Sequence, residues 1–193
     1  MKDLEKRTLD VELRVERREN APPKIIGHAA VFNSLSEDLG GFREQISPGA
    51  FAEAIKKDDV RALWNHNPDF ILGRNRSKTL TVSEDTKGLA IEIDPPDTQF
   101  ARDLMVSIER GDVSQMSFAF SVRQNGQNWG KDDEGRVVRT LTNVRLFDVS
   151  PVTYPAYTQT DVAVRSMEAW KENSAPSYSN ERRRLQLMEI DCP

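Results

Sequence analysis

The chain has 193 residues, of which 37% are hydrophobic and 30% are charged, and its formal net charge is −4. This length suits one ordinary domain with some additional chain. Lys and Arg are spread along the sequence, so nothing indicates the concentrated basic surface of a nucleic-acid-binding protein. This distribution does not exclude local basic patches.

Cysteine usage and hydropathy indicate the compartment. Cys192 is the only cysteine, which excludes an intramolecular disulfide and a cysteine-based metal site. The segment MKDLEKRTLDVELRVERRE at the start lacks the apolar stretch of a secretory signal. No window approaches the roughly eighteen apolar residues of a membrane-spanning helix. We therefore expect a soluble intracellular protein that is not secreted.

Alternating apolar residues predict strands near the start of the chain. Leu9, Val11, Leu13 and Val15 alternate with charged residues and predict one half-buried strand. The segment NAPP interrupts it, and residues 24–34 predict a second strand. A loop and a short strand, FREQI, follow.

A short helix and a further strand come next. In SPGAFAEAIKKDD, Ser47 is the expected N-cap and Pro48 suits the first turn. The segment VRALWNH then alternates, with Val60, Ala62 and Trp64 on one face, and by parity His66 falls on that face at the end of the strand. Asn67-Pro68-Asp69 is expected to form a turn.

The second half predicts more strands and one long helix. A hairpin is predicted for the segment KTLTVSEDTKGLAIEID. A helix is predicted for the segment PPDTQFARDLMVSIERGD, with Asp97 or Thr98 as its N-cap and Gly111 at its end. SQMSFAFSVRQ predicts a strand, and NGQNWGKDDEG a polar loop. Residues 136–157 supply one or two further strands ending at Pro151.

The elements together predict a mainly β (α+β) fold, with roughly seven short strands and two helices. Because strands and helices do not alternate regularly, a doubly wound parallel sheet is disfavoured, and a small antiparallel β-barrel flanked by helices fits best. Periodicity fades from about Arg165. We therefore divide the chain into a folded domain over residues 1–164 and a flexible tail over residues 165–193.

The sequence contains few combinations of residues that indicate a catalytic or ligand-binding site. The sequence lacks the glycine-rich nucleotide motifs and the H-E-x-x-H zinc motif. With two histidines, a zinc site would need mostly carboxylate ligands. A serine nucleophile with a histidine base and an orienting acid is the remaining option, and His66, Ser117 and Asp148 lie on three different predicted elements that can converge. Spacing alone does not single out this triple.

Six segments in order carry a family resemblance. They are IIGHAAVFNS, EQISPGAFAEAI, LWNHNPDFILGR, GLAIEID, GDVSQMSFAF and FDVSPVTYPAY. Between about Leu9 and Val164 the chain resembles the prohead (maturation) proteases of tailed bacteriophages. The resemblance implies a fold shared with the herpesvirus assemblins, a β-barrel flanked by helices. It also implies an enzyme that cleaves scaffold or capsid-protein segments inside the immature head.

The resemblance implies roles for individual residues. Ser117 in MSFAF is the implied nucleophile and His66 in WNHNPDF the implied base. Asp148, the acid before VSPVT, is the implied third member. The assemblins use a second histidine there, but no histidine follows Ser117 in this chain, and His28 precedes it in the wrong order. The resemblance implies no metal and no organic cofactor.

Each residue also has a structural interpretation. His66 could be a polar residue at a strand end, and His28 a structural imidazole. Asp148 could pair with Arg145 or Arg139 on the sheet surface. Ser114 and Ser150 are expected in turns, and Ser121 further along the same strand as Ser117. Backbone N–H groups or Arg74 could form an oxyanion hole.

The function predicted from these residues is a serine endopeptidase of phage head maturation. Its expected partners are the major capsid protein precursor or the scaffold protein, without a requirement for nucleic acid or membrane, and a homo-oligomer is possible. The expected location is the procapsid in the host cytoplasm. The tail is expected to be a propeptide or a docking segment. The alternatives are a non-enzymatic head-assembly or scaffolding protein and a zinc or carboxylate hydrolase.

Overall fold

The computed structural model describes residues 4–154 and 161–174. The strands in this part are β1 (Glu5–Asp10), β2 (Leu13–Arg18), β3 (Ala21–Val31), β4 (Arg43–Ile46), β5 (Arg61–Trp64), β6 (Asn67–Arg74), β7 (Leu80–Glu84), β8 (Gly88–Ile93), β9 (Gln115–Val122), β10 (Gln127–Lys131), β11 (Val137–Leu141) and β12 (Val144–Val152). The helices are α1 (Ala52–Lys57), α2 (Gln99–Arg110) and α3 (Asp161–Ser174), with a 3₁₀ turn, η1, over Asn75–Ser77.

The strands form three open sheets and not the closed antiparallel barrel expected from the sequence. One sheet has the order β1-β9-β12-β5-β6, a second β2-β3-β8-β7, and a third β10-β11-β4. The pairing is mixed, because β12 runs parallel to β5 and β11 runs parallel to β4. The fold is mainly β with a few helices, as predicted, but sequence periodicity does not specify which strands pair.

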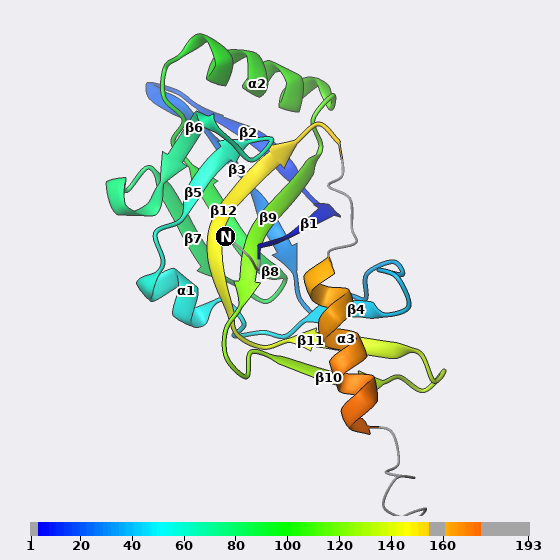
Figure 1. Cartoon of the computed structure of the whole chain (residues 1–193). Coiled ribbons are helices and arrows are strands. Elements are labelled where there is room, and N and C mark those ends of the chain that lie inside the picture. The colour runs from blue at the N-terminus through cyan, green and yellow to red at the C-terminus, as the bar shows by residue number, and fades with distance from the viewer. Residues whose placement is uncertain (1–3, 155–160, 175–193) are drawn as a thin grey trace, which may run out of the picture.

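One hydrophobic core lies between the five-stranded and four-stranded sheets (Figure 1). Phe118 and Phe120 of β9 face it from one sheet, and Ile25 and Leu89 from the other, all with no exposed surface. Helix α2 lies across one end of these sheets and adds buried Leu104. The alternate residues of β9 therefore point to the opposite face of the five-stranded sheet.

The predicted amino-terminal strand over Leu9–Glu16 is in fact two strands. β1 pairs with β9 in the five-stranded sheet, whereas β2 pairs with β3 in the four-stranded sheet. The chain passes from one sheet to the other between Asp10 and Leu13. Because both sheets bury one face against the same core, the apolar alternation continues through the change of sheet and conceals it.

The predicted hairpin and long helix are confirmed as β7–β8 and α2. Thr98 is the N-cap residue of α2, and Gly111 ends the helix with φ 81°, a conformation that glycine adopts without strain. The predicted cap of the first helix is wrong. α1 begins at Ala52, and Glu84 of β7 accepts hydrogen bonds from the N–H groups of Gly49 and Phe51 in the preceding turn.

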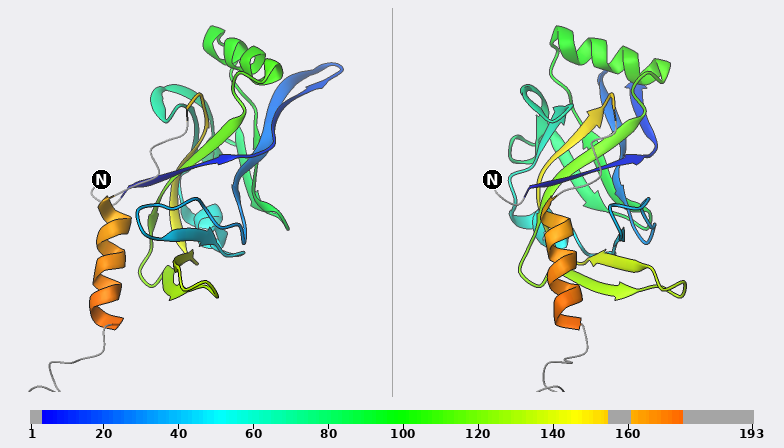
Figure 2. Two further views of the ribbon diagram at one scale, coloured as in Figure 1. Left: turned by 90° about the vertical axis from the view of Figure 1, so that its right-hand side faces the viewer. Right: turned by 45° about the vertical axis from the view of Figure 1, so that its right-hand side comes forward.

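Strand β10 and most of helix α3 occupy residues that were expected to lack regular structure, whereas β4 and β11 of the third sheet lie in segments predicted as strands. The predicted polar loop after β9 contains β10, which pairs with β11. Helix α3 lies beside the third sheet (Figure 2). Met167 of α3 packs against Phe42, and Trp170 stacks on Trp129 of β10 with ring centroids 6.2 Å apart. The predicted division after residue 164 falls inside this helix. The rest of the predicted tail, residues 175–193, lies outside the described residues.

A buried ionic cluster joins the five-stranded sheet to the third sheet. Its members are Glu5 and Arg7 of β1, Glu44 of β4 and Arg139 of β11. Arg139 donates to Glu5 at 2.8 Å and to Glu44 at 2.9 Å. Two carboxylates thus balance two guanidinium groups in the interior, which is the condition for burying such charges.

Candidate active site

His66 lies at the tip of the β5–β6 hairpin. Trp64 pairs with Asn67, so Asn65 and His66 form a two-residue loop, and both have positive φ, 55° and 56°. This is the pattern of a type I′ turn, which suits the twist of a hairpin. The parity argument that placed His66 at a strand end was therefore wrong, and Asn67 starts β6 instead of forming the predicted turn with Pro68 and Asp69.

Asn65 attaches this hairpin tip to the neighbouring strand β12. Its backbone N–H donates to the carbonyl of Pro151 at 3.0 Å. Its side-chain oxygen accepts the N–H of Thr153 at 2.8 Å, and its amide nitrogen donates to Thr153 Oγ1 at 3.2 Å. The residue before His66 is therefore held by one hydrogen bond to β12 and by two to Thr153, which directly follows that strand.

Ser117 lies near the middle of the five-stranded sheet. β9 pairs with β1 on one side and with β12 on the other, and Ser117 lies opposite Thr8 and Ser150. Met116 and Phe118, its neighbours, are buried in the core. Ser117 therefore points to the other face of a strand that is held on both edges, and it has no exposed surface.

The three predicted residues meet on this face. His66 Nε2 lies 2.7 Å from Ser117 Oγ, and His66 Nδ1 lies 2.6 Å from Asp148 Oδ1. Asp148, on β12, also accepts a hydrogen bond from the Ser150 hydroxyl at 2.7 Å. The pairing of β9 with β12 and of β12 with β5 brings these side chains together from positions far apart in the sequence.

The geometry assigns a direction to the hydrogen bonds. A carboxylate only accepts, so His66 Nδ1 carries the proton that binds Asp148. In the neutral imidazole Nε2 is then the acceptor and faces the Ser117 hydroxyl. Such an arrangement can remove the hydroxyl proton as the oxygen attacks an electrophile, while the nearby carboxylate balances the charge on the imidazole.

The alternative partners of Asp148 are engaged elsewhere. Arg139 belongs to the buried ionic cluster, and Arg145 lies over the ring of Phe147 at 5.1 Å from its centroid. Arg74, considered for an oxyanion hole, pairs with Asp59 at 2.6 Å. This hydrogen bond from Arg74 holds the pKa of Asp59 at about 2.

His28 is separate from this site. It lies in β3 of the four-stranded sheet, and its Nε2 is 2.8 Å from Asp85 Oδ2. The hydrogen bond from His28 holds the pKa of Asp85 at about 2. The sequence contains two histidines, and the structure places one with a serine and the other with an exposed carboxylate at a hairpin turn.

Sequence reasoning missed the position of Ser150. It was expected in a turn because it precedes Pro151, but it lies inside β12 with no exposed surface. A signal was present in the sequence, since Ser150 is two residues after Asp148 and period two places both on one face of a strand. The serine-proline pair concealed that signal.

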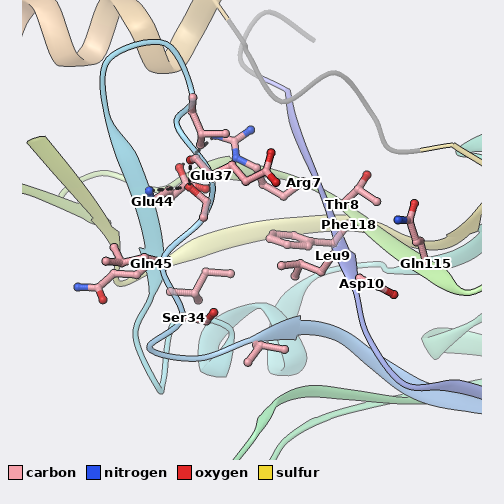
Figure 3. A pocket seen from close by; sticks show the side chains of 15 residues that line it. Arg7, Thr8, Leu9, Asp10, Ser34, Glu37, Glu44, Gln45, Gln115 and Phe118 are labelled. Atoms are coloured by element: carbon pink, nitrogen blue, oxygen red, sulfur yellow. Dashed lines mark hydrogen bonds and ion pairs between the residues drawn. The ribbon is translucent and has the colours of Figure 1, made fainter. Parts of the chain in front are cut away.

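A cavity in the described part of the chain lies away from the three predicted residues (Figure 3). It has a volume of about 340 Å³ and lies between β1 and the segment leading into β4, with Leu9, Phe118, Glu44 and Arg7 among its walls. Neither His66, Ser117 nor Asp148 lines it. Phe118 of β9, a residue of the hydrophobic core, lines this cavity, whereas the neighbouring Ser117 does not.

No group of three or more His, Cys, Asp and Glu side chains among the described residues could hold a metal ion. None of the described helices is long and apolar enough to cross a membrane.

Comparisons with known proteins identify the family. A search of curated proteins found no match. Among solved structures, the chain is similar to the bacteriophage T4 capsid assembly protease, gp21, with 12% sequence identity and a TM-score of 0.42, over 77% of this chain and 98% of that one. The sequence profile of the Caudovirus prohead serine proteases matches residues 10–173. The chain therefore belongs to the prohead serine protease family of the tailed bacteriophages.

Proposed function

We propose that the chain is a serine endopeptidase in which Ser117 is the nucleophile, His66 the general base and Asp148 the residue that orients His66. One observation carries this assignment. In a member of a serine protease family, a continuous line of hydrogen bonds runs from Ser117 through His66 to Asp148. The three groups occupy the relative positions that acyl transfer to a serine requires.

The proposed reaction begins when Ser117 Oγ attacks a peptide carbonyl and its proton passes to His66 Nε2. Asp148, which accepts the Nδ1–H bond, stabilises the resulting imidazolium. The tetrahedral intermediate collapses as His66 gives the proton to the leaving amine, and an acyl-enzyme forms on Ser117. Water, activated by His66, then releases the acid product and regenerates the serine. The reaction uses neither a metal nor an organic cofactor.

The proposed substrates are segments of the scaffold protein or of the major capsid protein precursor, cut inside the procapsid in the host cytoplasm, and the carboxy-terminal tail of the enzyme itself. Membership of the prohead protease family supports these substrates. The kinship of the fold with the herpesvirus assemblins is a further expectation, which superposition on an assemblin structure would test.

Co-expression with the capsid precursor tests the function. Wild-type enzyme should convert the precursor into discrete fragments, identified by mass spectrometry, and Ser117→Ala should leave it intact. Ser121→Ala is the matched control. Ser121 lies on the same strand as Ser117, but its register partner on β12 is Arg145, whereas that of Ser117 is Ser150. Ser117→Ala enzyme that still cuts the precursor would overturn the assignment. A folded wild-type chain that binds the precursor without cutting it would favour a non-enzymatic head-assembly protein.

A further inference from the structure

Ser150 makes a contact that the proposed reaction does not use directly. Its hydroxyl donates to Asp148 Oδ1 at 2.7 Å, the same oxygen that lies 2.6 Å from His66 Nδ1. Among the described residues, these two side chains supply the hydrogen bonds to the carboxylate of Asp148. One carboxylate oxygen is thus shared between the imidazole and a serine on its own strand.

The surroundings of Ser150 make this donor rigid. Ser150 has no exposed surface, and it lies directly opposite Ser117 in the β9–β12 ladder. Pro151, the next residue, has its carbonyl bound by the N–H of Asn65. The backbone that carries Ser150 is therefore held by β9 on one side and by the His66 hairpin on the other.

A second hydrogen-bond donor helps to define the orientation of the Asp148 carboxylate. Rotation about the bond that carries the carboxylate group of an aspartate is broad and nearly two-fold, so a single hydrogen bond leaves its orientation loosely defined. A second donor on a fixed strand limits that rotation. A hydrogen bond to an ionised group is also stronger than one between neutral groups, particularly away from water.

We propose that Ser150 is a positioning residue that holds the Asp148 carboxylate in the orientation from which it binds His66 Nδ1. The inference rests on the proposed function and deepens it, because Ser150 acts on the reaction only through Asp148. Ser150 is not the nucleophile, since its hydroxyl faces the carboxylate while His66 Nε2 faces Ser117.

Proton NMR of the full chain labelled with ¹⁵N-histidine tests this positioning directly. The chain has two histidines, so each signal is assigned with one His28→Gln variant. In the wild type, the Nδ1–H proton of His66 should resonate far downfield because it binds a buried carboxylate. In Ser150→Ala that resonance should broaden or disappear, while the signals of His28, which pairs with Asp85, should not change. Ser150→Thr keeps the hydroxyl and should restore the resonance.

Reactivity gives a second measurement, with phenylmethylsulfonyl fluoride as the probe and the modified residue located by peptide mapping. Labelling of Ser117 should be about ten- to a hundredfold slower in Ser150→Ala, the factor expected for one lost hydrogen bond to a charged group. In an Asp148→Ala background, Ser150→Ala should cause no further slowing, because the carboxylate on which it acts is gone. Label on Ser150 itself would overturn the assignment of its role.

The outcomes separate the two proposals. If Ser150→Ala keeps the His66 resonance and the labelling rate of the wild type, the positioning role is wrong and the protease assignment stands. If wild-type Ser117 is not labelled and the capsid precursor is not cut, the proposed function fails, whatever the NMR spectra show. Should Ser150→Ala fail to fold, judged by circular dichroism, Ser150→Cys replaces it, since it preserves the size of the side chain but provides only a weak donor.

Discussion

Two hydrogen bonds join the side chain of Asn65 to Thr153, the residue that directly follows β12. Asn65 Oδ1 accepts the Thr153 N–H at 2.8 Å, and Asn65 Nδ2 donates to Thr153 Oγ1 at 3.2 Å. Because Asn65 directly precedes His66 in a two-residue turn, this contact fixes the hairpin tip relative to the strand that carries Asp148.

Two variants of Asn65 should separate the contribution of its side chain from that of its backbone. Asn65→Gly tolerates the positive φ but loses both hydrogen bonds of the side chain. Its free energy of unfolding should therefore be about 1 kcal/mol lower, and its cleavage rate about tenfold lower, than in the wild type. Asn65→Ala should lose about 1 kcal/mol more, because alanine is strained at φ 55°. Urea denaturation and precursor cleavage measure both effects. Wild-type cleavage by Asn65→Gly would contradict the anchoring role.

Cleavage should require the neutral form of the His66 imidazole and should not depend on His28. The rate should fall in acid, because only the neutral ring can accept the proton of Ser117. His66→Asn, which tolerates the positive φ of this position, should lower the rate about a hundred- to ten-thousandfold. His28→Gln is the matched control and should keep the wild-type profile. A rate that does not fall in acid would argue against a histidine base.

The buried ionic cluster should dominate the effect of charge on stability. Burial would raise the pKa of Glu5, but the hydrogen bond and charge of Arg139, and then Arg7, hold that pKa below its ordinary value. Arg139→Met should lower the free energy of unfolding by about 3–5 kcal/mol, because it leaves Glu5 and Glu44 with one guanidinium between them.

Two further variants serve as controls for Arg139→Met in chemical denaturation. Adding Glu5→Gln should recover part of the loss, since one carboxylate then faces one guanidinium. Arg14→Ala removes an exposed pair with Glu12 and should cost much less, because solvent screens an exposed ion pair. Equal losses from Arg139→Met and Arg14→Ala would show that burial of the cluster has no energetic consequence.

Acid should weaken the fold through Asp59, a half-buried carboxylate that is paired with Arg74. The hydrogen bond from Arg74 lowers the pKa of Asp59 from 3.8 to about 2. Since the folded pKa is the lower one, this pair stabilises the fold above pH 3.8, and its contribution is lost as the pH falls through about 2. Asp59→Asn should therefore reduce the slope of unfolding free energy against pH in that interval, measured by urea denaturation. An unchanged slope would mean that the pair does not contribute.

Much of the local structure could be predicted from residues alone. The period-two alternation of Met116, Phe118 and Phe120 identified β9 and placed Ser117 on the face away from the core. Thr98 and Gly111 marked the ends of α2. These predictions succeeded because each depends on neighbours within one element, where the periodicity of the chain and the preferences of cap residues operate.

Other elements could not be predicted because their cause lies far away in the sequence. β10 carries the polar segment QNWGK and is ordered by β11 and by Trp170 of α3. The turn before α1 is capped by Glu84, from another strand. Local patterns contain no information about partners of this kind, since the stabilising group arrives only when the chain folds.

The same division applies to the candidate site. The residues alone show two histidines among many serines and acids, and the order of segments that identifies the family. The type I′ turn at His66, the position of β12 between β9 and β5, and the oxygen of Asp148 that Ser150 shares with His66 become visible in the folded chain. The physical reason is that strand order and register are set by the packing of whole sheets, whereas period-two patterning specifies only which face of a strand a side chain occupies.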